Sequence, residues 1–325
     1  VYKRQEHKRH LKGFIHSESS TGQTVYIEPE ETLELNNEIV SLGFAEKREI
    51  ERLLKELTQL IGKESYRLSA SLKAITYLDS LFARAKYSIE IIGSFPSIDN
   101  GKPLFISDAR HPVLLKKLGR QNTVPLSFKL SDEKVVLITG PNAGGKTVVL
   151  KTIGILSLLL QSGIHIPVSP DSNFHYFEDI HVDIGDEQSI EDDLSTFSSH
   201  LTNIKNILFK SDENTLVLLD EIGTGTDPSE GSALAAAILL ELKEKNALVF
   251  ASTHHGNLKL IANDEKEFIN AAMEFDHKNL IPTYQFKLGI PGSSYAFEIA
   301  RRIGIDKSLL NNALSVMDTD KHKIE

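Results

Sequence analysis

The sequence contains no cysteine among its 325 residues. A chain without thiols has no disulfide framework, no cysteine-ligated zinc and no thiol nucleophile, which excludes disulfide-rich secreted scaffolds and cysteine hydrolases. This composition suits a reducing compartment, and we therefore expect a cytoplasmic protein.

Long hydrophobic runs are also missing. The most apolar stretch, Val148–Leu160, spans 13 residues and contains Lys151, whereas a membrane helix needs about 20 apolar residues. We therefore expect a buried helix at this stretch and no membrane partner. The chain starts at Val1 without a basic and then apolar leader, which we interpret as an internal segment of a longer protein.

An excess of basic charge is absent as well, because the formal net charge is −9. A protein that holds nucleic acid on a broad basic face usually has the opposite balance. Residues 1–95 contain 14 basic and 14 acidic residues, so the acidic excess lies in the rest of the chain. Contacts to a phosphate-rich partner would have to come from this neutral region or from other domains.

The region 1–95 predicts a helical arm that begins with a short β-hairpin. Two β-rich runs, 11–16 and 23–27, flank a polar loop, as in a hairpin. Apolar residues then recur at helical spacing, and Gly62–Ser65 is a candidate break between two stripes. Two long helices packed as a hairpin and one very long arm both fit this pattern.

The region 96–325 predicts an α/β domain with a mainly parallel sheet. Short apolar runs at 135–139, 216–219 and 247–252 alternate with helical stretches, and each run is followed by a polar loop. The Gly- and Pro-rich stretch 91–103 suits a joint between domains. We therefore expect two domains, 1–95 and 96–325.

A phosphate-binding loop follows the first of these runs. Residues 140–147 match the pattern GxxxxGK[ST], directly after an apolar strand and before an apolar helix. Glycines let backbone N–H groups surround a phosphate, and the helix N-terminus adds partial positive charge. Lys146 would neutralise phosphate oxygens, and the Thr147 hydroxyl would bind Mg²⁺. The nucleotide-binding residues expected here are Gly140, Pro141, Asn142, Ala143, Gly144, Gly145, Lys146, Thr147 and Val148.

Carboxylates and a histidine end the two following strands. Asp220 would hold Mg²⁺, and Glu221 would polarise the attacking water as a catalytic residue together with Lys146. His254 would sense the γ-phosphate. The adjacent His254 and His255 also suggest a metal site, but neighbouring side chains diverge, and we disfavour that interpretation.

A polar stretch before the acidic pair supplies two more candidates, Gln188 and Ser195. Ser195 is a good helix N-cap, and the stretch by itself favours an ordinary cap. However, the order of phosphate loop, Gln, Ser-Thr at a helix start, Asp-Glu and His matches ABC-type ATPases. In those enzymes the serine-bearing helix completes the site of the other subunit.

At this point the chain resembles the MutS-type ATPases, and specifically the bacterial MutS-two branch. Lys146-Thr147-Val148 and the string 195–200 (Ser-Thr-Phe-Ser-Ser-His) favour this branch. The matching motifs are Gly13–Pro29, Leu35–Glu38, Ala109–Pro112, Thr139–Val148, Ile184–Glu191, Leu194–Leu201, Asp220–Pro228 and Phe297–Arg302.

The resemblance implies an ABC-type P-loop fold and a homodimer that holds two ATP molecules with Mg²⁺ between its subunits. It also implies that 1–95 is a lever or clamp and that 96–325 is the ATPase domain, which ends in a helical dimerisation segment. In that arrangement Gln188 senses the metal or water, Ser195 acts across the dimer and His254 is the switch histidine. The family is associated with branched or mismatched DNA, suppression of homologous recombination, and splitting of collided ribosomes. Its endonuclease activity belongs to a C-terminal Smr domain, which we do not find in this sequence.

Two functions stay open at this stage. One is an ATP-hydrolysing enzyme that couples dimer closure to DNA or ribosome binding. The other is a nucleotide-gated binding clamp with little turnover. The base contact is open too, because Phe128 is the only aromatic residue between Pro112 and Val135.

Overall fold

The computed structural model describes residues 2–4, 12–141, 144–185, 193–276, 281–291, 300, 303–306, 308–310 and 312, with the backbone alone at 2–4 and 193–197. The chain divides into two compact units, Val1–Ser80 and Leu81–Glu325. The division at residue 95 and the lever assignment stay predictions. No helix within the described ranges is long and apolar enough to cross a bilayer.

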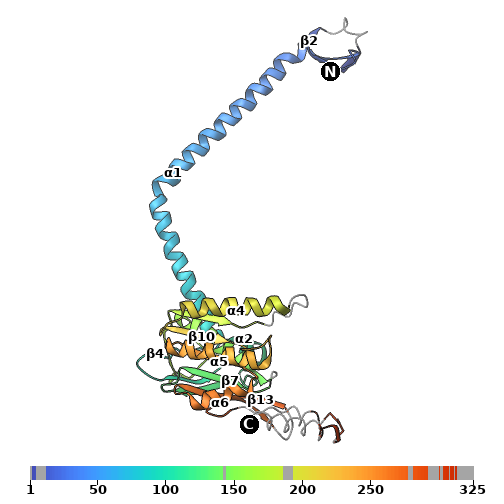
Figure 1. Ribbon diagram of the computed structural model, residues 1–325. Helices are drawn as coiled ribbons and strands as arrows, with labels where there is room; N and C mark the ends of the chain where they lie inside the picture. Colours follow the sequence, from blue (N-terminus) through green and yellow to red (C-terminus); the bar gives the residue numbers. More distant parts are fainter. Residues whose placement is uncertain are drawn as a thin grey trace. The chain divides into compact units, whose positions relative to one another are not determined.

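The first unit consists of a small antiparallel sheet and most of one long helix. Strands β1 (Tyr2–Arg4), β3 (Thr24–Pro29) and β2 (Gly13–Glu18) pair in that spatial order. The predicted hairpin is therefore present as β2 and β3. Helix α1 then runs from Glu30 to Glu90, over 61 residues (Figure 1).

Helix α1 settles the choice between a helical hairpin and a single arm. The candidate break at Gly62–Ser65 does not interrupt the helix, which continues through it. One glycine costs a helix only about 1 kcal/mol, and good helix formers flank this one. Ion pairs one turn apart, from Arg52 to Glu49 (2.7 Å) and to Glu56 (3.1 Å), support the exposed helix locally.

The second unit contains a six-stranded sheet in the order β13-β12-β7-β11-β10-β9. Five strands are parallel, and β13 pairs antiparallel with β12 at one edge. The predicted α/β class with a mainly parallel sheet is therefore confirmed. The strands of this sheet are β7 (Val135–Thr139), β9 (Asp179–Asp183), β10 (Thr215–Leu219), β11 (Leu248–Ser252), β12 (Phe268–Asp276) and β13 (Ile281–Leu288).

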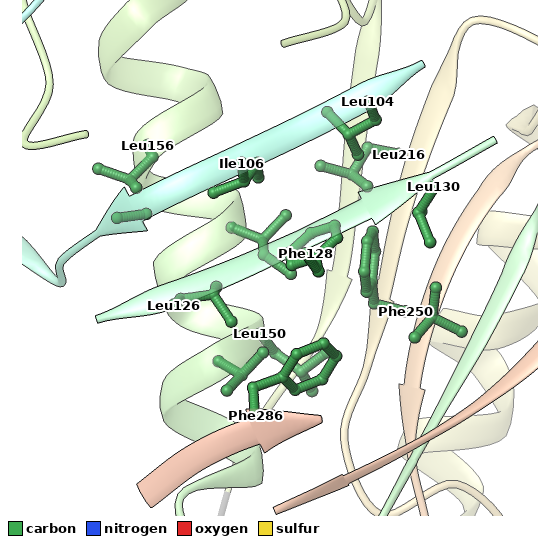
Figure 2. Packing of buried hydrophobic residues seen from close by; sticks show 14 of the residues in the cluster. Leu104, Ile106, Leu126, Phe128, Leu130, Leu150, Leu156, Leu216, Phe250 and Phe286 are labelled. Atoms are coloured by element: carbon green, nitrogen blue, oxygen red, sulfur yellow. The ribbon is translucent and has the colours of Figure 1, made fainter. Parts of the chain in front are cut away.

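Both faces of this sheet are covered, which explains why its central strands are apolar throughout. On one face, residues of β7, β10 and β11 pack against α4 (Asp193–Lys210), α5 (Pro228–Glu244) and α6 (Gly256–Asp264). On the other face, the alternate residues of the same strands pack against α3 (Lys146–Gln161) and a smaller sheet. Figure 2 shows this second core, in which Phe128, Phe250 and Phe286 lie close to Leu150 of α3.

The smaller sheet has the order β4-β8-β5-β6. Helix α2 follows β5 and is capped by His111, whose Nδ1 accepts a hydrogen bond from the Val113 N–H. The remaining elements are β4 (Ser97–Ile98), β5 (Leu104–Ala109), α2 (Pro112–Leu118), β6 (Leu126–Leu130) and β8 (Asn173–Phe174).

Candidate nucleotide-binding site

The predicted phosphate loop connects the buried central strand β7 to helix α3. Gly140 has a φ of +133° and Gly145, the N-cap of α3, has a φ of +96°, and both conformations favour glycine. A Cβ built on Gly144 would lie 3.2 Å from the Cβ of Met273. The loop therefore depends on these glycines for both conformation and space.

Lys146 is the first residue of α3, and only 2% of its surface is exposed. Its Nζ donates a hydrogen bond to the Gly140 carbonyl at 2.8 Å. Burial lowers the pKa of this ammonium group, while the negative charges of Glu221 and Asp220 act in the opposite direction. The lysine is thus a partly desolvated cation held at the start of the phosphate loop.

Asp220 lies directly after β10 and connects two neighbouring strands. Its Oδ2 accepts a hydrogen bond from the Thr147 hydroxyl at 2.5 Å. Its Oδ1 accepts one from the hydroxyl of Ser252, which ends β11. The structure therefore brings the two predicted metal residues, Thr147 and Asp220, into direct contact.

Ser252 is a site residue that the sequence analysis missed. Besides contacting Asp220, its Oγ accepts a hydrogen bond from the Glu221 N–H at 2.8 Å. The available signal was a serine at the end of a predicted strand, but its partner lies 32 residues away. Only the pairing of β10 with β11 shows that the two strand ends meet.

Glu221 turns away from the strand direction. Its φ of +50° is left-handed, which is uncommon for a residue with a side chain. The Thr224 hydroxyl donates to the Glu221 carbonyl at 2.8 Å, which closes the turn. The Glu221 Oε1 lies 3.4 Å from the Nε2 of His254, so the predicted water-activating and sensing residues are adjacent.

The second histidine has a different place. His255 is the N-cap residue of α6, and its Nε2 lies 3.0 Å from the Gly223 carbonyl oxygen. The described part of the chain contains no group of three metal-ligating side chains of the His, Asp and Glu types.

Several predicted site residues cannot be placed in full. Asn142, Ala143 and Gln188 lie outside the described residues. Ser195 is in the first turn of α4, where only the backbone is described. Its role across a dimer stays a prediction.

A cleft of about 470 Å³ opens beside the phosphate loop. Its walls include Leu118, Val124, Thr147, Val148, Met273 and Tyr284. Phe128 does not line this cleft, because its ring is 6% exposed and packs at 5.6 Å from the rings of Phe250 and Phe286. Tyr284 on β13 lines the cleft and is 53% exposed.

Comparison with known families agrees with this geometry. The family model for MutS domain V matches residues 136–320, more than half of the chain. The chain belongs to the MutS domain V family. The resemblance inferred from the motifs, and the P-loop ATPase type of fold that it implied, are therefore confirmed.

Curated relatives of this MutS-type chain extend the match toward its N-terminus. It is 46% identical to an Endonuclease MutS2 from Caldanaerobacter subterraneus over 99% of its own length and 40% of the relative's. It is 46% identical to an Endonuclease MutS2 from Finegoldia magna over 98% of its own length and 40% of the relative's. It is 44% identical to one from Bacillus cytotoxicus over 99% of its own length and 41% of the relative's. The chain thus spans about 40% of the length of the curated relatives it matches.

Domains of this kind use a nucleotide and Mg²⁺, and the residues present fit both groups. Gly140 and Gly145 adopt the left-handed conformations that shape the loop, and the buried Lys146 supplies positive charge. Hydroxyl and carboxylate oxygens are the ligands that Mg²⁺ prefers. The Thr147 and Asp220 oxygens, which lie 2.5 Å apart, would hold the ion, directly or through water.

Proposed function

We propose that this chain is the ATP-hydrolysing part of a dimeric MutS-two-type protein. The observation that carries the proposal is the convergence of Lys146, Thr147, Asp220, Glu221 and His254 at the carboxyl ends of β7, β10 and β11. This is the end of an open α/β sheet where ligands bind. In this proposal the chain acts in the cytoplasm.

Each residue in this site has a separate task. The Lys146 ammonium group moves from the Gly140 carbonyl to the phosphate oxygens. The partial positive charge at the N-terminus of α3 also stabilises the negative charge of the phosphate. Bound Mg²⁺ would neutralise the charge that develops on the phosphate oxygens. Glu221 accepts a proton from the attacking water. Ser252 holds the Glu221 backbone N–H and the Asp220 carboxylate in place. His254, 3.4 Å from Glu221, holds that carboxylate and responds to the state of the γ-phosphate.

The cleft beside the phosphate loop is the proposed site of the base. Its apolar wall and the exposed Tyr284 ring suit a planar heterocycle. Replacing Tyr284 by alanine should weaken ATP binding by the value of a base–aromatic stack, about 1–3 kcal/mol. Tyr284→Phe is the matched control and should bind ATP with nearly unchanged affinity.

Helix α4 is the element that we propose to contact the second subunit. In this proposal Ser195 acts on the nucleotide of the partner subunit, so ATP closes the dimer and hydrolysis reopens it. The motion would be passed to branched or mismatched DNA or to collided ribosomes. The support for these partners is the family resemblance. The relatives' name, Endonuclease MutS2, supports only a nucleic-acid substrate, and any nuclease activity would belong to the longer protein.

The test is the pair Glu221→Gln and Ser195→Arg, each compared with wild type. Glu221→Gln should bind ATP but hydrolyse it about 10²–10⁴-fold more slowly and accumulate dimers, because a positioned general base contributes that factor. Ser195→Arg should block dimer closure and leave nucleotide binding by the single subunit intact. Unchanged turnover in Glu221→Gln would remove Glu221 from the catalytic role.

A matched control is Glu244→Gln at the far end of α5, where the side chain is 72% exposed. This variant should hydrolyse ATP at the wild-type rate. Steady-state phosphate release with and without branched DNA or ribosomes separates the enzyme from a clamp with little turnover. A wild-type rate near zero in all three conditions would favour the clamp.

A further inference from the structure

Two side chains of helix α4 contact the carboxylate of Asp183, at the edge of the main sheet. The Nδ1 of His200 lies 3.0 Å from Asp183 Oδ2, and the Nδ2 of Asn203 donates to Asp183 Oδ1 at 2.8 Å. Asn203 also donates to the Val182 carbonyl at 3.2 Å. The Asp183 side chain is 11% exposed, and both of its oxygens contact side chains on one face of α4.

Asp183 is at the same time a direct neighbour of the hydrolysis site. It ends β9, it pairs with Leu219 of β10, and its carbonyl accepts the N–H of Asp220 at 2.8 Å. A small cavity of about 70 Å³ has Asp183 and His200 on its wall together with Asp220 and Glu221. This volume suits one or two water molecules among polar groups.

The same helix carries Ser195 in its first turn. Ser195 precedes His200 by five residues in the same helix. Because an α-helix rises about 1.5 Å per residue, the two positions are about 7.5 Å apart along the helix axis. A shift of the Asp183–His200 contact would therefore displace Ser195 as well. Neither His200 nor Asn203 belongs to the predicted catalytic set.

We propose that His200 and Asn203 are positioning residues that couple the hydrolysis site of their own subunit to the serine that this subunit offers to its partner. The Asp183 carboxylate fixes the angle of α4 relative to the strand ends that carry Asp220 and Glu221. This inference rests on the proposed two-subunit site. It predicts that the contacts of Asp183 with His200 and Asn203 affect hydrolysis of the nucleotide bound by the partner subunit more than hydrolysis of the nucleotide bound by the same subunit.

Mixed dimers of the full chain test this directly. Wild-type chains are mixed with a large excess of Lys146→Ala chains, which cannot hold nucleotide but still offer Ser195, so each active site has a known donor. Adding His200→Ala to the Lys146→Ala chain should lower phosphate release per wild-type chain by about tenfold, the value of one hydrogen bond to a charged group. Adding His200→Ala to the nucleotide-binding chain instead should change the rate less than twofold.

Conservative variants separate positioning from general destabilisation. An asparagine amide reaches the place of the histidine Nδ1, so His200→Asn on the donor chain should restore most of the rate, whereas His200→Gln should not. Asn203→Ala on the donor chain should repeat the loss, and it provides the test if His200→Ala does not fold. Asn206→Ala, an exposed asparagine of the same helix, is the matched control and should have no effect.

The outcomes distinguish the two proposals. Equal losses from both placements of His200→Ala, or no loss from either, would overturn the coupling role and leave the proposed ATPase intact. If the Lys146→Ala chains do not stimulate hydrolysis by dilute wild-type chains, the two-subunit site itself fails. Dissociation constants for a fluorescent ATP analogue, measured on dilute single chains, should be unchanged by His200→Ala in every case.

Discussion

The two units of this chain are stabilised in opposite ways. In Val1–Ser80, Val25 and Ile27 are the buried hydrophobic residues among those described, and the leucines and isoleucines of α1 from Leu35 onward are exposed. In Leu81–Glu325, two hydrophobic clusters cover both faces of the main sheet. The helix therefore depends on local interactions such as intrahelical hydrogen bonds and ion pairs, whereas the candidate nucleotide site depends on contacts between distant segments.

The largest difference between the units should follow from the same leucine deletion made in each. Leu156 of α3 is fully buried, and Leu156→Ala should lower the free energy of unfolding of the second unit by about 2–5 kcal/mol. Leu57 of α1 is 54% exposed, and Leu57→Ala should change stability by less than about 0.5 kcal/mol. Denaturant unfolding followed by circular dichroism measures both, and equal losses would contradict the comparison.

The same serine-to-alanine change in each unit compares their contributions to ATP hydrolysis. Ser252→Ala removes a hydrogen bond to Asp220 and should weaken Mg²⁺-dependent activity about 10–100-fold, as loss of an outer-sphere partner does. Ser71→Ala, on the exposed α1, should leave that activity unchanged. The measurement is the Mg²⁺ concentration for half-maximal ATP hydrolysis. A Ser252→Ala curve that overlays wild type would show that Asp220 does not need this support.

Adding one methyl group should destabilise the second unit. A Cβ on Gly231, in the first turn of α5, would lie 2.1 Å from the Gly223 carbonyl oxygen, a backbone atom that cannot move freely. Overpacking of this kind costs about 1–3 kcal/mol, so Gly231→Ala should lower the unfolding midpoint. It should also slow hydrolysis, because Gly223 follows the Glu221 turn. An unchanged midpoint would mean that the loop relaxes without cost.

A glycine-to-alanine substitution in α1 should instead raise stability. Gly62 lies within α1, and a Cβ there would meet nothing within 4 Å. Gly62→Ala should therefore stabilise the helix by about 0.5–1 kcal/mol, through better helix propensity. Thermal melting of the helical circular dichroism signal would detect this gain. A loss instead would show that α1 requires glycine at position 62.

Local signals in the sequence predicted much of this molecule. The strand at 135–139 coincides with β7, and the phosphate loop and the Asp220-Glu221 pair follow the expected strands. These motifs are contiguous because a glycine turn and a helix N-terminus must be adjacent in the chain to surround a phosphate. Apolar periodicity also predicted the long helical region, but it left one helix or two undecided.

The sequence by itself determined the family and the α/β class, and it predicted the phosphate-binding residues, because the signals for all three lie in short runs of neighbouring residues. Only the tertiary structure decided that Ser252 supports Asp220, that Tyr284 rather than Phe128 reaches the cleft, and that Asp183 ties α4 to the site. These contacts join residues tens of positions apart. They depend on the order of strands in the sheet, which local patterns do not specify.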